Sequence, residues 1–125
     1  MKKILLLLIF VLSVGICDAA NQPRISGKVF RSGETFLDFS SSTKGVYSYS
    51  EDNRNVITRT FTYSTRYLMK SNNYSKGPIY KWQITVRVAM SYGTKDLKFY
   101  VETYENGSLK GNKALASDGE NWDIL

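Results

Sequence analysis

The chain has 125 residues and a formal net charge of +6, and it contains one cysteine and no histidine. The absence of histidine excludes Ser-His-Asp catalysis and Cys-His nucleophiles, and together with the single cysteine it excludes the usual zinc ligand sets. This length suits one domain and is too short for two.

The first twenty residues have the layout of a secretory signal peptide. They begin with positive charge, continue with an apolar run too short to span a bilayer comfortably, and end in small residues. These features are Lys2 and Lys3, the run 4–14, and Ala19 with Ala20. We therefore expect residues 1–20 to be cleaved and residues 21–125 to form a single exported domain, periplasmic or extracellular.

Cys17 lies at the end of the apolar run and has two interpretations. A lipidated Cys17 would tether the domain to a membrane. However, the lipoprotein pattern requires a small residue before the cysteine, and Ile16 is large and branched. The favoured interpretation is an ordinary residue close to the cleavage point. No cysteine follows residue 20, so the domain gains no disulfide and must be held by its core.

Charge is distributed unevenly along the chain. Residues 53–98 hold nine lysines and arginines against one aspartate, a net +8, whereas residues 99–125 hold five acids against two lysines, a net −3. A basic middle favours an acidic partner, which outside the cytoplasm means a protein face, an anionic glycan or another envelope component. The alternative is that the surplus lysines serve solubility and that the acidic tail folds against the basic sheet.

After residue 24 the apolar residues alternate with a period of two, which is typical of strands. The expected strands are 24–31, 35–40, 45–50, 56–69, 80–92, 97–104 and 109–115. Residues 121–125 either add an edge strand or pack Trp122 over one end of the core. The sequence thus predicts an all-β fold without helices, a single antiparallel β-sandwich or small barrel of about seven strands.

The clearest strand is 80–92, because its even positions are apolar or aromatic and its odd positions are mostly polar. Further along the chain, Asn106-Gly107 suits a two-residue hairpin turn, since both residues tolerate positive φ angles. Residues 79–115 are therefore expected to form a three-stranded antiparallel meander.

The polar faces of this meander provide the candidate binding residues. Cations alternate with tyrosines there, a combination that suits stacking on sugars and contacts at protein interfaces. The candidates are Lys81, Arg87, Lys98, Tyr100 and Tyr104. The alternative is that cross-strand tyrosines only stabilise the sheet. Loop 71–78 is a second candidate for binding. The sequence predicts no catalytic residue, metal site, cofactor or nucleotide site.

The leading functional hypothesis is an exported, non-enzymatic β-domain that binds a protein or an anionic glycan through this basic, tyrosine-rich face. One alternative is a membrane-active protein that inserts the amphipathic hairpin 80–104. Another is a small carboxylate-dependent hydrolase, with Glu34 and Asp38 or Glu102 and Glu105 as the acidic pair. Membrane contact is expected only if Cys17 is lipidated or the hairpin inserts.

Overall fold

The computed structural model describes residues 21–52, 55–72 and 77–125, which form eight strands and no helix. The predicted signal peptide and Cys17 lie outside these residues, as does the middle of loop 71–78. In the described part of the chain, no helix is long and apolar enough to cross a membrane.

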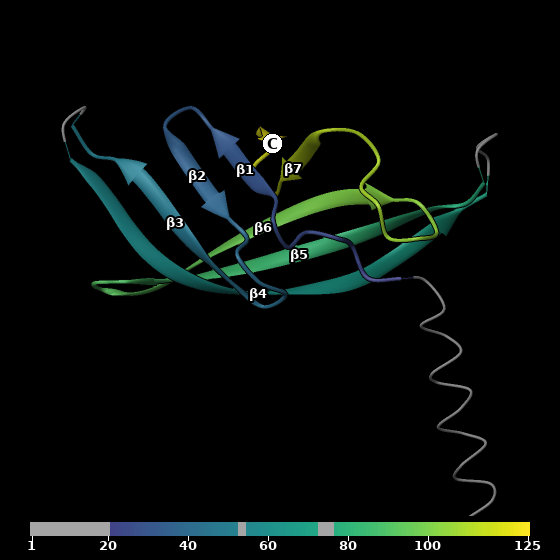
Figure 1. Ribbon diagram of the computed structural model, residues 1–125, viewed down its shortest axis with the longest axis horizontal. Helices are drawn as coiled ribbons and strands as arrows, with labels where there is room; N and C mark the ends of the chain where they lie inside the picture. Colours follow the sequence, from purple (N-terminus) through teal and green to yellow (C-terminus); the bar gives the residue numbers. More distant parts are fainter. Residues whose placement is uncertain (1–20, 53–54, 73–76) are drawn as a thin grey trace, which may run out of the picture.

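The strands pair antiparallel in chain order and close into a barrel (Figure 1). They are β1 Val29–Ser32, β2 Thr35–Asp38, β3 Lys44–Ser50, β4 Val56–Ser71, β5 Ile79–Met90, β6 Gly93–Thr103, β7 Lys113–Ala116 and β8 Asn121–Ile124. The closing contact joins β8 to β1, with Phe30 opposite Ile124. The all-β prediction is confirmed. The C-terminal residues, expected either to add an edge strand or to pack Trp122 over one end of the core, instead form the closing strand β8.

Three long strands, β4, β5 and β6, form one wall along the length of the molecule (Figure 1). The short strands β1, β2, β7 and β8 complete the barrel on the other side. The predicted meander is present as β5, β6 and β7. The outer side of the long wall faces solvent.

The interior is filled by the alternate residues of each strand. Ile84, Val86 and Val88 of β5 are fully buried, as the period-two pattern of 80–92 predicts. Aromatic rings fill the centre, where Phe99 lies 5.4 Å from Phe30 and 5.1 Å from Trp122 between ring centroids. Such edge-to-face pairs add to the stabilisation from burial. The core thus holds the fold without a disulfide.

The N-terminal segment differs from the sequence prediction. Residues 24–31 were expected to form one strand, but β1 begins only at Val29. Gly27 has a φ of +85°, which turns the chain, and the preceding residues cross one end of the barrel. There Ile25 is 1% exposed, and the Arg24 amide donates to the Gly107 carbonyl at 2.9 Å. Residues 21–25 therefore close this end as a strap.

A bulge in β4 changes which side chains face outward. Tyr67 pairs with Trp82 and Met69 with Lys81, so Leu68 is an extra residue between them. The sequence pattern placed Met69 on the same side as Phe61, but the bulge moves it to the outer side. As a result Leu68 and Met69 are exposed next to Lys81.

The last strand of the meander is shorter than predicted. Residues 109–115 were expected to form the returning strand, with Gly111 as its weak point, but only an isolated bridge joins Leu109 to Thr103. Gly111 has a φ of +83°, which interrupts the strand, and β7 starts at Lys113. The chain consequently leaves β6 after Lys110, whose amide still bonds to the Glu102 carbonyl, and residues 111–112 make no pair with it.

Candidate functional site

The register of β5 against β6 brings four predicted residues to one outer face. Opposite each other lie Lys81 and Glu102, Gln83 and Tyr100, Thr85 and Lys98, and Arg87 and Asp96. The predicted residues on this face are thus Lys81, Arg87, Lys98 and Tyr100. The described strands form one closed barrel, and among them no second sheet packs over these residues.

A groove of about 400 Å³ opens on this face where β6 and β7 separate. Its lining combines lysines with large apolar or aromatic side chains. The lysines are Lys81, Lys110 and Lys113, and the large side chains are Leu68, Tyr100 and Leu115. The bulge in β4 supplies Leu68, and the interruption at Gly111 leaves Lys110 in the connection rather than in a strand.

The large side chains of the groove are exposed to an unusual degree for apolar residues. Tyr100 is 37% exposed, Leu68 38% and Leu115 44%. The Tyr100 hydroxyl accepts a hydrogen bond from Nε2 of Gln83 at 3.2 Å, which fixes the ring on the surface. Exposed apolar groups gathered in one hollow and bordered by charge are typical of interaction sites.

The charges of the groove favour an acidic ligand. Three lysines and one acid, Glu102, line it, and since Asp123 pairs with Lys113, the unbalanced charge comes from Lys81 and Lys110 against Glu102, a net +1. The Lys110 amide donates to the Glu102 carbonyl at 2.8 Å and so holds the connection against β6. Lys113 forms an ion pair with Asp123, which also lies 3.6 Å from Arg31.

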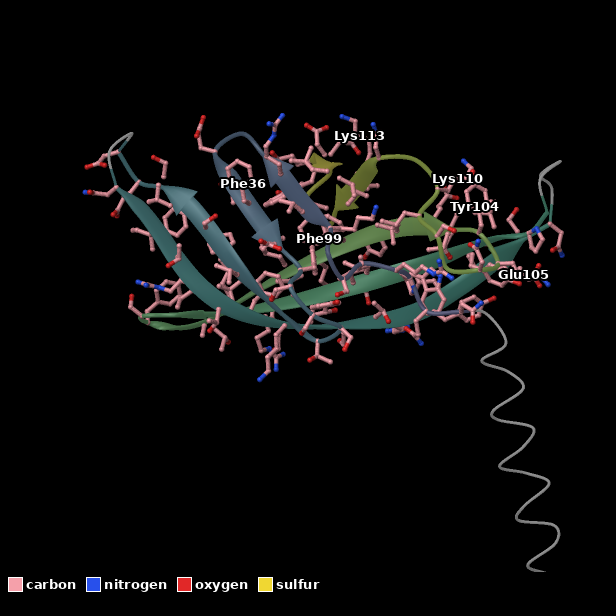
Figure 2. The ribbon with its side chains drawn as sticks, viewed as in Figure 1. Phe36, Phe99, Tyr104, Glu105, Lys110 and Lys113 are labelled. Atoms are coloured by element: carbon pink, nitrogen blue, oxygen red, sulfur yellow. The ribbon has the colours of Figure 1, made fainter. Side chains whose placement is uncertain are left out.

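The remaining predicted residues lie outside the groove. Arg87 donates two hydrogen bonds to the Asp96 carboxylate, at 3.0 and 3.3 Å, so an acid on the same face balances its charge. Lys98 lies beside Tyr100 on the outer side of β6 but does not line the groove. Tyr104 follows β6 at one end of the barrel, with Glu105 and Lys110 (Figure 2).

Two aspartates of the outer surface are held in the charged form. Hydrogen bonding to Arg87 lowers the pKa of Asp96, and hydrogen bonding to Lys113 lowers the pKa of Asp123. Because the folded-state pKa is depressed, the stabilisation is complete above the unfolded value, about 3.9, and is lost as the pH falls below it. We expect the urea midpoint to decline between about pH 5 and pH 2, and Asp96→Asn with Asp123→Asn to flatten that decline. An equally steep decline in the double variant would contradict this assignment.

The acidic pairs considered for hydrolysis are not arranged for that chemistry. Glu34 lies in the β1–β2 turn and Asp38 at the far end of β2, about 13 Å along the strand. Glycosidases place their two carboxyl groups within about 5–9.5 Å. Glu102 lines the groove, whereas Glu105 lies in the turn beyond β6. Among the described residues, no group of three or more acids, cysteines or histidines is arranged to hold a metal ion.

These features define a class of protein: a closed all-β barrel with a filled aromatic core and a lysine-bordered groove on its outer wall. Comparisons with protein-family models, with curated proteins and with solved structures each return no match. The groove is therefore the feature of the molecule that indicates its function.

Proposed function

We propose that the chain is an exported, non-enzymatic β-barrel domain that binds a protein partner, and that the basic groove receives an acidic segment of that partner carrying apolar side chains. The observation that carries this proposal is the placement of Lys81, Lys110 and Lys113 around Leu68, Tyr100 and Leu115. Lysines attract the acidic groups, and the exposed side chains provide apolar area to bury on binding.

The apolar part of the groove favours a protein over an anionic glycan. Sugars are bound mainly by aromatic stacking and hydrogen bonds, whereas this groove contains two exposed leucines beside one tyrosine. Met69, opposite Lys81 in the register, adds a third exposed aliphatic side chain nearby. Methionine and tyrosine are enriched at protein interfaces.

The membrane-active alternative has less support. In hairpin 80–104 the apolar face lies inside the barrel, where Trp82, Ile84 and Phe99 are buried. The outward face carries charged and polar residues such as Lys81, Gln83 and Lys98. Insertion of the hairpin would require opening the closed barrel and exposing its core.

The experiment measures binding of a fluorescent peptide of alternating glutamate and leucine, with polyglutamate and polygalacturonate as competitors. The double variant Lys81→Glu with Lys110→Glu is expected to weaken binding about tenfold or more, because two attractive charges become repulsive. Leu115→Ser is expected to weaken it severalfold and to leave polyglutamate binding unchanged.

The matched control is Arg24→Glu with Lys28→Glu, which changes the net charge equally at exposed positions outside the groove. If both double variants lose the same affinity, only overall charge attracts the peptide and the proposal fails. If polygalacturonate competes better than the peptide at equal charge, the partner is a glycan and not a protein.

A further inference from the structure

Another hollow, which we call the strap pocket, lies where the strap meets β4. Its volume is about 440 Å³, which is within the usual range for ligand sites. The strap, the purple segment that leads into β1 in Figure 1, lines it together with Ser26. The remaining lining residues are Ser42 of the β2–β3 connection and Tyr63 and Thr65 of β4. None of these residues lines the groove.

The strap pocket is fixed by contacts within the protein. The Thr65 hydroxyl donates a hydrogen bond to the side-chain carbonyl of Gln22, which joins β4 to the strap. Ile25 is 1% exposed and anchors the strap in the core. The Tyr63 hydroxyl donates to the Ser41 carbonyl at 2.6 Å and so holds the ring at the pocket. A site that is formed before its ligand arrives needs little ordering on binding.

The lining of the strap pocket is polar apart from a few flat apolar surfaces. Ser26 and Ser42 are exposed, so their hydroxyls can reach a ligand. Pro23 and the half-buried ring of Tyr63 supply the apolar surfaces. Among the described residues, no large apolar side chain that is exposed lines this pocket, in contrast with the groove. Hydroxyls and an amide beside an aromatic ring suit a sugar, which presents hydroxyls at its edge and C–H groups on its face.

The charge of the strap pocket comes from Arg24. Among the described residues, it is the one charged side chain in the lining, and it takes part in none of the ion pairs. The adjoining segments hold further charges, which bring the neighbourhood to a net +1. The charges are those of Arg24, Lys28 and Lys44 against Asp38 and Glu105. One guanidinium in a lining without acids suits a single carboxylate, which arginine can bind through two parallel hydrogen bonds.

We propose that the strap pocket binds a saccharide unit that carries one acidic group, as a uronic acid does. The Arg24 guanidinium binds the carboxylate, Ser26 and Ser42 bind ring hydroxyls, and the Tyr63 ring lies against an apolar face of the sugar. The strap pocket and the groove have different lining residues, so the inference does not depend on the proposed function.

The test uses a disaccharide with one glucuronate ring, its methyl ester and acetate, with binding followed by amide signals in NMR spectra. The disaccharide is expected to shift the amide signals of Arg24, Ser42 and Thr65. The ester keeps the sugar but loses the charge, so it should bind about tenfold more weakly. Acetate should shift these signals only at much higher concentration, because it lacks the sugar. Equal binding by the acid and the ester, equal binding by acetate, or no shift at about 10 mM disaccharide would overturn the proposal.

Variants assign the two parts of the ligand to their side chains. Arg24→Gln is expected to weaken binding of the acid about tenfold and to leave the ester unchanged, so the preference for the acid disappears. Ser26→Ala with Ser42→Ala should weaken binding of both compounds severalfold. Lys28→Gln is the matched control, since it removes the same charge from a nearby exposed position outside the pocket. If Lys28→Gln has the same effect as Arg24→Gln, only overall charge attracts the acid and the proposal is wrong.

Discussion

Phe99→Ala is expected to destabilise the domain by about 3–5 kcal/mol, the range for removing a buried aromatic ring from a packed core. Phe99 is fully buried and contacts rings from two neighbouring strands, Phe30 of β1 and Trp122 of β8. These two strands form the closing pair of the barrel. The cavity left by the substitution would therefore weaken the core and the closure together. Urea unfolding followed by circular dichroism measures the effect.

Phe36→Ala provides the matched control, since it removes the same ring from an outward position. Phe36 is half-buried on β2, next to the buried Leu37, and lies away from Phe99 near the outside of the barrel (Figure 2). We expect a loss of about 1 kcal/mol or less there. Similar losses for the two variants would mean that Phe99 is not a centre of the core.

The sequence predicts the long strands well because each of them buries one face. In β5 every second residue is apolar, and this period alone fixes the strand and its inward side. The short strands carry less information. In residues 109–115 the sequence marks Gly111 as a weak point, but it does not show that pairing with β6 stops there, because that depends on the left-handed conformation that Gly111 adopts. Barrel closure depends on contacts between residues far apart in the chain, Phe30 and Ile124, which no local pattern reveals.

The candidate site was predictable only in part, for the same reason. Alternation places Lys81 and Tyr100 on outward faces, and simple antiparallel pairing brings those faces together. Leu68 enters the groove through a bulge, and Lys110 and Lys113 enter it because a strand breaks. Strict alternation of inward and outward residues predicts neither the bulge nor the break in the strand. For Arg87 the sequence prediction included too much. Arg87 was a candidate binding residue, but its cross-strand partner Asp96 neutralises its charge.

The irregular ends of β4 shape the outer surface of the barrel. This strand has 16 residues and is longer than either neighbour, β3 with 7 or β5 with 12. At one end its bulge delivers Leu68 to the groove, and at the other end residues 56–60 extend past β5.

Gly107→Ala is expected to cost about 2–4 kcal/mol, because two penalties combine. Gly107 has a φ of +91°, a left-handed conformation that strains a residue with a Cβ. An added Cβ would also lie 2.5 Å from the Gln22 carbonyl oxygen. The strap is held at this point by the bond from Arg24 to Gly107, so relief of the clash would lift residues 21–25 and expose Ile25.

Gly119→Ala separates the two penalties. Gly119 has a φ of +93°, nearly the same as Gly107, but an added Cβ there meets nothing within 4 Å. Its substitution should cost only the conformational part, about 1–2 kcal/mol. Hydrogen exchange gives the second readout: in Gly107→Ala the Arg24 amide should exchange faster, whereas in Gly119→Ala it should stay protected. Equal losses in stability, with Arg24 protected in both variants, would show that the strap does not depend on the absence of a side chain at Gly107.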